Sequence, residues 1–380
     1  MTGYYYSFFI IFSGFLSAVV LFAFARHVAN ENPTLHKENL QTDEEYDLRK
    51  MNLFSIIIPA RNEEANIGKL LESIKKQNIK PLEIIVVDDF STDKTAEIAK
   101  KYDAGLIMPE PLPEGWTGKN WACYTGAQKA KGQILVFVDA DVEFETGAIE
   151  KLLYKSATEG AVVSVQPYHK IKKFYENISV LFNMIAFAGI NSFTIAGRLF
   201  KPKGVYGPVM AIPAEKYFAS GGHKSVNGYV LEDMEMGRVF ADKGFKIYNY
   251  GGKGSINFRM YPEGFKSLIE GWSKNFASGA SGVPWQMFVL IYLWIACGTS
   301  IFINMASAGF KGQNVIVYIL LYAMYCAAFR LISLQLGNFR WYTSFFYPFF
   351  MLCFIVIFLY SIYKKIFIKK VQWKGREIKV

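Results

Sequence analysis

The sequence predicts an α/β domain with a twisted, mostly parallel sheet, joined to several transmembrane helices. Two observations predict this fold class. Within residues 53–258, short apolar runs alternate with helical periods, and such alternation is typical of right-handed βαβ crossovers. On either side of this stretch the chain carries long uncharged apolar runs, and a helix needs roughly 20 such residues to cross a bilayer.

The apolar residues are concentrated in four runs. Hydrophobic residues make up 52% of the 380 residues and charged residues only 19%, less than the quarter that is usual in soluble proteins. The uncharged runs cover residues 6–25, 285–310, 314–329 and 342–363. We therefore expect a transmembrane anchor within residues 1–29 and transmembrane segments over 285–363, in a multi-pass protein of the cell membrane.

The first run has one feature of a cleaved signal peptide, because Ala23 and Ala25 flank Phe24. Against cleavage, no Lys or Arg precedes the run, and its 20 residues exceed the roughly 7–15 apolar residues of a signal core. The prediction is an uncleaved anchor.

Basic residues cluster beside the last apolar run. The net charge is +10, and the basic tail 364–380 holds seven Lys and Arg residues. A basic tail next to an apolar helix favours anionic lipid headgroups on the cytoplasmic side of a membrane. Because no basic segment stands apart from the apolar runs, a nucleic-acid partner is not expected. The sequence indicates no particular protein partner.

The α/β domain is predicted element by element from apolar runs and helix signals. Residues 30–52 are polar and acidic and are predicted to form a linker. Short runs buried on both faces are typical of parallel sheets, which predicts strands at 54–59, 84–87 and 134–138. Helices are predicted after 62–64, with Ile67, Leu70, Leu71 and Ile74 on one face, after 91–93, and over 120–131 before Gly132.

Carboxylates follow two of the predicted strands. Asp88 and Asp89 end the second strand, and Asp139 and Asp141 follow the third. Parallel sheets bind ligands at the carboxyl ends of their strands, and in an extended chain Asp139 and Asp141 point to the same face. Such oxygen ligands suit Mg²⁺ or Mn²⁺ bound with a nucleotide diphosphate. The alternative is a solvated loop, and the position after a buried strand favours the metal site.

Other side chains near these strand ends are candidates for the same ligand. Asp88 or Asp89 can accept a hydrogen bond from a nucleoside, while a residue of 91–93 caps the next helix. Backbone amides at the helix start near Glu63 form a positive end, although Glu63 is equally an ordinary first-turn residue. Lys119, at the start of the third helix, can bring positive charge to the diphosphate.

Three further features each allow two interpretations. Asp233, at a predicted helix start, can take a proton from a hydroxyl acceptor or complement the helix dipole. His223 contacts a substrate or lies in a solvated loop. Trp116 and Trp121 form walls of a donor cleft or anchor the protein at a membrane interface.

Two apolar stretches are not predicted to cross the membrane. Residues 259–284 carry apolar side chains at helical spacing, which predicts an amphipathic helix that lies in the membrane interface or packs on the domain core. Residues 178–197 are uncharged, but a span there would place Asp139 and Asp233 on opposite sides of the membrane. We expect an interfacial or re-entrant helix at 178–197.

Five motifs follow one another along the chain: PARNEE (59–64), VVDDFSTDKT (86–95), GWTGKNWA (115–122), VFVDADV (136–142) and LED (231–233). Together they resemble the family 2 glycosyltransferases. Further stretches, among them VSVQPYHKIKKFYE (163–176) and VQWKGRE (371–377), look like the bacterial carotenoid glycosyltransferases that act on diaponeurosporenoate. The resemblance runs almost end to end. It implies the GT-A fold, a Rossmann-like nucleotide-diphospho-sugar transferase domain, over residues 53–258.

The resemblance implies roles for single residues. Those that would hold the nucleoside are Glu63, Asp88 and Asp89. Lys119 would approach the donor phosphates, and Asp139 and Asp141 would bind the metal and the diphosphate. Asp233 matches the catalytic base of inverting members. The acceptor-binding candidates are His223 and Trp272, and Trp272 alone stands in the region of the family's Gln-x-x-Arg-Trp motif.

The activity that the resemblance implies is metal-dependent transfer of a hexose, glucose from UDP-glucose, to a membrane lipid with inversion. The implied acceptor group is the carboxyl of an apocarotenoid acid such as 4,4'-diaponeurosporenoate. A lipid hydroxyl, as in a hopanoid, a diacylglycerol or a polyprenyl phosphate, is the alternative, because an acid is ionised near pH 7 and needs no base. A nucleotidyltransferase would require a Gly-rich triphosphate loop that residues 59–64 lack. A non-catalytic membrane scaffold also stays open.

The expected topology has one conflict. With the catalytic domain in the cytoplasm, three later spans would leave the basic tail outside, against the positive-inside tendency. Pro348 lies near the middle of the last apolar run and is predicted to break it into a re-entrant hairpin. Such a hairpin would return the tail to the cytoplasm.

Overall fold

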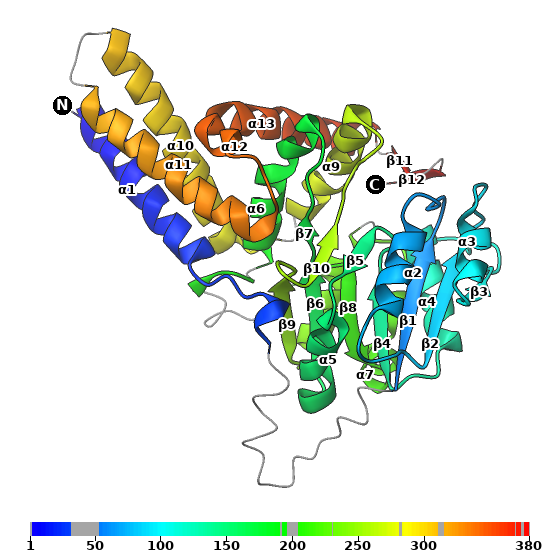
Figure 1. Ribbon diagram of the computed structural model, residues 1–380. Helices are drawn as coiled ribbons and strands as arrows, with labels where there is room; N and C mark the ends of the chain where they lie inside the picture. Colours follow the sequence, from blue (N-terminus) through cyan, green and yellow to red (C-terminus); the bar gives the residue numbers. More distant parts are fainter. Residues whose placement is uncertain are drawn as a thin grey trace, which may run out of the picture. The chain divides into compact units, whose positions relative to one another are not determined.

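A seven-stranded sheet forms the centre of the α/β part of the chain (Figure 1). The structure is a computed structural model and describes residues 2–31, 53–190, 192–195, 204–229, 231–280, 283–310, 315–368, 370–373 and 376–379. The chain divides into an α/β unit, residues 26–169, 202–260 and 370–380, and a helical unit, residues 1–25, 170–201 and 261–369. From residue 32 onward, the predicted linker lies outside the described residues.

The sheet of the α/β unit has the strand order β3-β2-β1-β4-β8-β6-β9. Only β8 is antiparallel to its neighbours, β4 and β6, so the predicted mostly parallel sheet is confirmed. Its strands are β1 (Phe54–Ala60), β2 (Glu83–Asp88), β3 (Gly105–Ile107), β4 (Ile134–Val138), β6 (Val162–Gln166), β8 (Val209–Pro213) and β9 (Ile247–Gly251). A three-stranded sheet has the order β5 (Val142–Phe144), β10 (Ile256–Phe258) and β7 (Tyr168–His169). A two-stranded sheet pairs β11 (Lys370–Trp373) with β12 (Arg376–Lys379).

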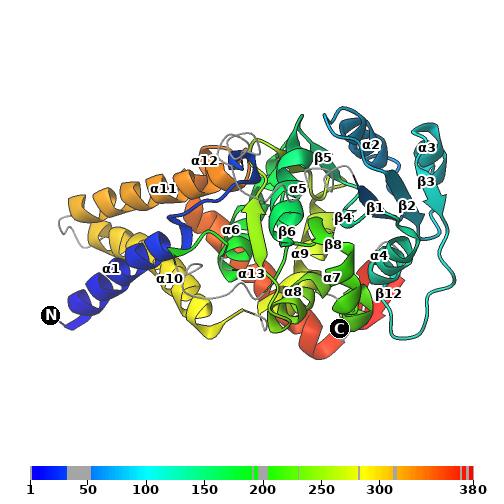
Figure 2. The same ribbon diagram turned by 90° about the horizontal axis from the view of Figure 1, so that it is seen from below.

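Helices cover both faces of this sheet (Figure 2). They are α2 (Ile67–Lys75), α3 (Thr95–Lys101), α4 (Gly118–Lys129), α5 (Ala148–Glu159), α7 (Ala214–Ala219) and α8 (Glu232–Asp242), with short 3-10 turns at Val28–Asn30 and Gly222–Val226. Among its described residues, the unit has two hydrophobic core clusters. Ile56 and Ile58 of β1 belong to the cluster that includes α2, α3 and α5, and Ile57 belongs to the cluster that includes α4, α7 and α8. Because successive strand residues point to opposite faces, the apolar runs are buried on both sides, as predicted.

Two glycines let α4 lie close against the sheet. A Cβ atom on Gly126 would lie 2.5 Å from Cγ2 of Ile57, and one on Gly132 would lie 2.4 Å from the backbone nitrogen of Ser55. Ala122 and Gly126 therefore form the small-residue face of the helix. The helix begins and ends two residues earlier than the predicted 120–131, with Ala130 as its C-cap.

One edge of the sheet gathers the strand ends that carry polar side chains. Because β1, β2 and β4 are parallel, Asp88 at the end of β2 and Asp139 after β4 lie at the same edge. The antiparallel β8 begins at this edge. The amide of Asp139 accordingly donates a hydrogen bond to the carbonyl of Pro208, at 2.8 Å.

The helical unit consists of apolar helices and short polar connections. Its elements are α1 (Thr2–Phe22), a 3-10 turn at Phe174–Ile178, α6 (Ser179–Gly189), α9 (Phe265–Ala280), α10 (Trp285–Phe310), α11 (Ile316–Leu336), α12 (Tyr342–Phe345), α13 (Tyr347–Tyr363) and a π-helical turn at Lys364–Ile368. Among the described residues, three helices are long and apolar enough to cross a membrane, at Trp285–Phe310, Ile316–Leu336 and Tyr347–Ile368. Long apolar helices of this kind indicate association with a membrane.

The N-terminal helix α1 packs along α10 (Figure 1). A Cβ on Gly14 would lie 2.1 Å from Cβ of Cys297, so the two backbones approach closely. The Cys297 thiol also lies 3.4 Å from the carbonyl oxygen of Ile11. This packing makes α1 a part of the helical unit, and the uncleaved anchor stays a prediction.

The two apolar stretches that were not expected to cross the membrane form helices of the same unit. α6 has only 11 residues, all but one of them buried, and is too short to be a span. In α9, Leu268 and Trp272 are buried whereas Phe265 is half exposed. The burial of Leu268 and Trp272 therefore reflects packing within the protein, which was one of the two predicted alternatives for this helix.

The last two apolar runs differ in extent from their predictions. α11 continues seven residues beyond the predicted end at 329, to Leu336, and includes Arg330, which donates to the carbonyl of Phe339 at 2.6 Å. The run 342–363 is broken at Phe346, between α12 and α13. Pro348 lies in the first turn of α13, where the missing amide costs no hydrogen bond. The predicted break in this run is therefore present, but it lies two residues before Pro348, and the re-entrant hairpin stays a prediction.

Candidate active site

Two loops at the edge of the sheet are joined side chain to backbone. The amides of Asn62, Glu63 and Glu64 donate to side-chain oxygens of Ser91, Thr95 and Asp93, at 2.9, 2.8 and 3.0 Å. In return, the amides of Thr92 and Lys94 donate to side chains of the first loop, Asn62 and Glu64, at 2.8 and 3.1 Å. These reciprocal bonds fix the loop after β1 against the loop after β2.

This joint corrects three expectations. The amides near Glu63 are bonded to protein side chains, so they do not form the open positive end that the sequence suggested. The helices also begin later than predicted, at Ile67 and Thr95. The N-cap of α3 is Lys94, which makes no side-chain capping bond, so the expectation that a residue of 91–93 caps this helix was wrong. Asp93 precedes the N-cap, and its carboxylate accepts from the amide of Thr95 at 3.0 Å.

The three nucleoside candidates lie in or beside these loops. Asp88 and Asp89 are buried. One oxygen of Asp88 accepts from the amide of Ser91 at 2.9 Å, which gives Asp88 a part in shaping the loop. Asp89 lies 3.8 Å from the guanidinium of Arg61, and Glu63 accepts from the side chain of Asn66 at 3.0 Å. The carboxylates are therefore held in place rather than loosely solvated.

Asp139 and Asp141 lie on a tight turn. The amide of Val142 donates to the carbonyl of Asp139 at 3.2 Å, so residues 139–142 reverse direction between β4 and β5. The expectation that an extended backbone points both carboxylates the same way was wrong. The turn still keeps the two side chains within three residues of one another at the carboxyl end of β4.

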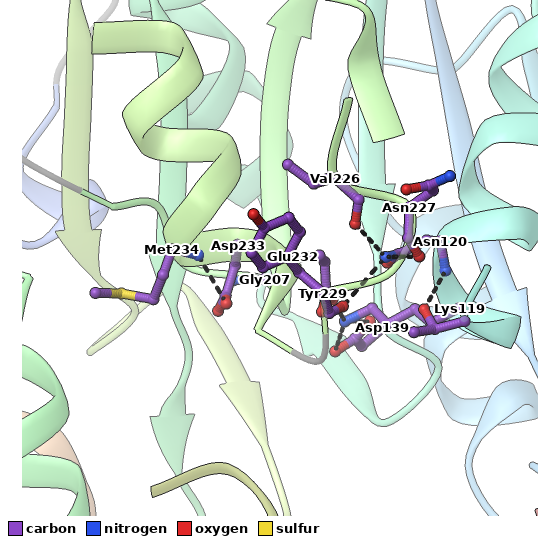
Figure 3. Close-up of polar contacts among 11 residues, drawn as sticks. Lys119, Asn120, Asp139, Gly207, Val226, Asn227, Tyr229, Glu232, Asp233 and Met234 are labelled. Atoms are coloured by element: carbon purple, nitrogen blue, oxygen red, sulfur yellow. Dashed lines mark hydrogen bonds and ion pairs between the residues drawn. The ribbon is translucent and has the colours of Figure 1, made fainter. Parts of the chain in front are cut away.

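Lys119 joins three elements at this edge (Figure 3). Its Nζ lies 2.9 Å from Oδ1 and 3.1 Å from Oδ2 of Asp139, and 3.3 Å from Oε1 of Glu232. Burial alone would lower the pKa of the Lys119 ammonium, but the charges of Asp139 and Glu232 raise it well above its ordinary value. Lys119 is therefore a fixed positive charge between α4, β4 and α8.

Asp233 follows Glu232 in the first turn of α8. Its carboxylate accepts from the amides of Met234 and Gly207, at 2.9 and 3.3 Å (Figure 3). Burial raises the pKa of the Asp233 carboxyl to about 7, and the charge of Glu232 adds to this effect while Lys119 opposes it. A carboxylate with a pKa near the working pH is suited to take up a proton.

His223 is buried, so the interpretation of a solvated loop was wrong. Its Nδ1 lies 2.9 Å from the hydroxyl of Tyr217, and its ring packs against Phe137 of β4 with centroids 4.9 Å apart. Burial, with the charge of Lys119, lowers the pKa of His223 to about 3. The ring is therefore neutral at physiological pH.

These residues line one pocket within the α/β unit. Lys119, Asp139, Glu232, Asp233, His223 and Gly207 contribute to its wall, with Pro59 at the end of β1. A Cβ on Gly207 would lie 3.2 Å from Oδ2 of Asp233 and 3.5 Å from Nζ of Lys119. Glycine thus leaves room between the acid and the ammonium. Asp141 and the nucleoside candidates are not among the residues that line this pocket.

Sequence reasoning assigned no role to Asn120, which is completely buried. Its side-chain Nδ2 donates to the carbonyls of Val226, Asn227 and Tyr229, at 2.9, 3.1 and 3.3 Å (Figure 3). These carbonyls belong to the loop that leads to Glu232 and Asp233. Asn120 lies in the first turn of α4, where an Asn is not unusual, so the sequence carried no signal for this role.

The tryptophans of the sequence motifs pack in different places. Trp116 and Trp121 contact each other edge to face at 5.1 Å, and both contact Tyr124 of α4. Trp272 lies in the helical unit, where its indole stacks on Phe182 at 4.7 Å and donates to the hydroxyl of Ser179 at 3.0 Å. These contacts give Trp272 a packing role.

Comparison with known proteins identifies the family. The family model for Glycosyl transferase family 2 matches residues 55–216. The 4,4'-diaponeurosporenoate glycosyltransferase of Staphylococcus aureus strain USA300 is 36% identical over 331 residues, 86% of this chain and 88% of that protein. The chain belongs to glycosyltransferase family 2. The same enzyme of strain MRSA252 is 35% identical over the same length.

Membership of family 2 makes the protein a glycosyltransferase and its α/β unit a GT-A domain. Two solved structures are more distantly similar. The mannosyltransferase PcManGT of Pyrobaculum calidifontis, in complex with GDP-Man and Mn²⁺, is 16% identical with a TM-score of 0.49 over 81% of this chain and 87% of that one. The glucosyl-3-phosphoglycerate synthase of Mycobacterium tuberculosis, with Mn²⁺ and UDP, is 21% identical with a TM-score of 0.45 over 64% and 84%.

Proposed function

We propose that this glycosyltransferase moves glucose from UDP-glucose to the carboxyl group of an apocarotenoid acid such as 4,4'-diaponeurosporenoate. The observation that carries this proposal is the 36% identity, over 86% of the chain, to relatives named for that acceptor. The GT-A domain supports a nucleotide-sugar donor, and the apolar helices support an acceptor dissolved in the membrane. We place the α/β unit in the cytoplasm of a multi-pass membrane protein.

The donor would lie along the carboxyl edge of the sheet. Asp88, Asp89 and Glu63 are proposed to hold the nucleoside, in loops whose reciprocal hydrogen bonds keep them rigid. Lys119 is proposed to face the diphosphate, because its charge is fixed at the end of β4. Positive charge here would stabilise the negative charge that develops on the leaving diphosphate.

A divalent cation fits the chemistry of this edge. Mg²⁺ and Mn²⁺ take oxygen ligands and usually add water and substrate phosphates to a few carboxylates. Asp141 and Asp139 are the proposed ligands, and a cation on Asp139 would displace part of its ion pair with Lys119. Among the described residues, no three His, Cys, Asp or Glu side chains form a ready metal cluster. Further ligands would therefore come from the diphosphate, whose charge the cation would offset.

Transfer would proceed by inversion at the anomeric carbon. An acceptor carboxylate oxygen attacks this carbon, the bond to the UDP oxygen breaks, and UDP leaves with the bonding electrons. Because an acid acceptor is already ionised near pH 7, Asp233 need not remove a proton from it. His223, neutral and buried in the same pocket, is the proposed contact for the acceptor.

A lipid hydroxyl is the second candidate acceptor, and one observation favours it. The pKa of Asp233 is raised to about 7, which suits a general base for a hydroxyl group. On this alternative, Asp233 accepts the hydroxyl proton as the new glycosidic bond forms.

The products separate the two acceptors. Membranes containing the protein are incubated with radiolabelled UDP-glucose and either 4,4'-diaponeurosporenoate or diacylglycerol, and the lipid extract is treated with mild alkali. We expect label in the apocarotenoid that alkali releases, because the product is an ester. Alkali removes the acyl chains of a glucosylated diacylglycerol but leaves its glycosidic bond, so label recovered as glucosylglycerol would establish the second candidate instead.

A variant of a proposed metal ligand distinguishes an active enzyme from a non-catalytic membrane scaffold. Release of UDP should require Mn²⁺ or Mg²⁺ and should be lost in Asp141→Ala. The matched control is Asp103→Ala, because Asp103 is an exposed carboxylate whose ion pair with Lys75 lies on the surface. Equal UDP release by both variants would remove Asp141 from the proposed site.

A further inference from the structure

The last apolar segment, α12 and α13, is attached at both ends to polar parts of the helical unit. At its beginning, the amide of Arg340 donates to the side chain of Asn177 at 3.0 Å, and the amide group of Asn177 lies 3.1 Å from the hydroxyl of Tyr342. Asn338 bonds the backbone of Ile171 in both directions. The chain that enters α12 is therefore tied to residues 171–177.

The far end of α13 is tied to α9. The hydroxyl of Ser361 donates to the carbonyl of Ser273 at 2.6 Å, and the ammonium of Lys364 lies 3.2 Å from the hydroxyl of Ser273. Lys266 and Glu270 of α9 have side chains that are 92% and 52% exposed. Charged side chains with such exposure belong in water or among headgroups rather than in hydrocarbon.

Both attachment points lie where the chain joins the α/β unit. Lys170 directly follows the last residue of β7, and Tyr261 comes shortly before α9. Residues 171–177 and the start of α9 also bond each other, through Lys173 to the carbonyl of Pro262 at 2.9 Å and Tyr175 to that of Tyr261 at 2.8 Å. The two ends of the α12–α13 segment are therefore attached to the parts of the helical unit whose chain continues directly into the α/β unit.

The start of α13 nevertheless reaches apolar depth. The hydroxyl of Tyr347 donates to the carbonyl of Gly298 at 3.0 Å, and its ring packs on Tyr325 at 4.5 Å. Gly298 comes 13 residues after the start of α10, roughly 20 Å along the helix at 1.5 Å per residue. Because α10 has 26 residues, this position is its midpoint, which a crossing helix places near the middle of the roughly 30 Å hydrocarbon core. Figure 1 shows α13 oblique to α10 and α11.

α13 also has two different apolar faces. Tyr347, Phe350, Met351, Phe354 and Ile357 are buried against the protein. The opposite face holds Phe349, Leu352, Val356, Leu359 and Tyr363, each more than half exposed. A helix that is apolar all round needs an apolar environment on both sides. Lipid acyl chains are the occupant that fits the exposed face, because the neighbouring helices of the unit are themselves long enough to cross a bilayer.

We propose that α12 and α13 form a re-entrant membrane segment, which enters and leaves the bilayer on the side of the α/β unit. The chain then crosses the membrane three times, by α1, α10 and α11. The inference concerns the helical unit and does not depend on the acceptor or the donor. Its turning point is the backbone break at Phe346, and α13 rises from mid-depth toward Lys364 at the surface.

This arrangement resolves the conflict in the topology. With three crossings, the basic tail 364–380 lies on the same side as the α/β unit, in agreement with the positive-inside tendency. The opposite side receives the N-terminus and residues 311–314, which contain a single Lys or Arg. High hydropathy alone marks α13 as a candidate span, because hydropathy does not distinguish a helix that crosses from one that returns.

Sidedness tests the proposal directly. One full-length variant carries a cysteine added after Val380, and its matched control carries Lys311→Cys between α10 and α11. Intact and permeabilised cells are labelled with a membrane-impermeant maleimide, and the unsubstituted chain gives the background of the native cysteines. We expect Lys311→Cys to react in intact cells and the terminal cysteine only after permeabilisation. Reaction of both from the same side would overturn the proposal.

The depth of α13 gives a second test that does not use the tail. Single cysteines at Phe349, Leu352, Val356, Leu359 and Tyr363 carry a fluorophore, and nitroxide lipids quench it from the bilayer centre. A re-entrant α13 makes quenching strongest at Phe349 and progressively weaker toward Tyr363. A crossing helix makes quenching strongest at Val356 and weak at both ends, which would overturn the proposal. Neither test requires activity, so a wrong acceptor leaves both results interpretable.

Discussion

The ammonium of Lys119 lies 2.9 Å from one carboxylate oxygen of Asp139 and 3.1 Å from the other. Twenty residues separate the two in the chain, one helix and one strand. A lysine in the first turn of a helix is unfavourable for the helix dipole, and the carboxylates of Asp139 and Glu232 compensate for it here. The start of α4 and the end of β4 therefore form one charged site, where a nucleotide diphosphate would meet a fixed cation.

Replacing Lys119 by Met should reduce UDP release by about 10²–10³-fold, the usual effect of removing one donor aimed at developing charge. Asp139 and Glu232 would lose their shared partner. Because both are partly exposed, we expect a loss of only about 1–2 kcal/mol in stability. Enzyme assays and thermal unfolding in detergent measure the two effects separately. Lys129→Met, at the exposed end of the same helix, is the control, and equal activity of the two variants would contradict the assigned role.

Asn120→Ala should impair catalysis through the loop that precedes Glu232 and Asp233. The change removes three hydrogen bonds, one buried and two partly buried, and should cost about 1–3 kcal/mol of stability. Because a misplacement of about 1 Å at a reacting group costs roughly 10²-fold, kcat should fall by at least tenfold at a temperature where the variant is folded. KM for the donor should change little. Gln128→Ala, exposed on α4, is the control, and an unchanged kcat in Asn120→Ala would refute the positioning role.

The pH dependence of transfer should reveal whether Asp233 acts as a base. With its pKa raised to about 7, Asp233 is protonated below this pH and ionised above it. Transfer to a hydroxyl acceptor should therefore fall about tenfold per pH unit below 7, and Asp233→Asn should abolish it. Transfer to an acid acceptor should stay level between pH 6 and 8, because that acceptor is ionised throughout. A level profile with a hydroxyl acceptor would exclude Asp233 as the base.

Gly126→Ala tests the close packing of α4 on the sheet. The added methyl would lie 2.5 Å from Ile57 and 3.0 Å from Val87, and such overpacking costs about 1–3 kcal/mol. The better helix propensity of Ala returns at most about 1 kcal/mol. We expect a lower unfolding temperature, whereas Gln128→Ala on the exposed face should leave it unchanged. A more stable Gly126→Ala variant would show that the contact relaxes.

Some parts of the structure were predictable because they depend on local patterns. The apolar runs specified β1, β2 and β4 on both faces of the sheet, and Ile67, Leu70, Leu71 and Ile74 specified the buried face of α2. Helix starts were less certain: α2 and α3 begin later than predicted, since bonds between the two loops hold residues 62–64 and 91–94 outside the helices. That joint depends on side chains about thirty residues apart in sequence.

The candidate site was predictable only in part, for the same reason. The motifs indicated Lys119, Asp139 and Asp233, which the fold brings to one pocket. Glu232 and Asn120 gained their roles from partners more than a hundred residues away. Trp272 and His223 show the converse, because both are buried among ring partners, whereas the sequence allowed a solvated loop for His223.

By itself, the sequence determined that this chain has an α/β domain with helices apolar enough to span a membrane and belongs with the family 2 glycosyltransferases, because composition, apolar periodicity and linear motifs are local properties. Only the tertiary structure decided which carboxylates share a cation, where Asp139 and Asp141 turn, and to which elements the two ends of α13 attach. Those features follow from contacts between distant segments, whose burial sets the charge states and positions that no linear pattern specifies.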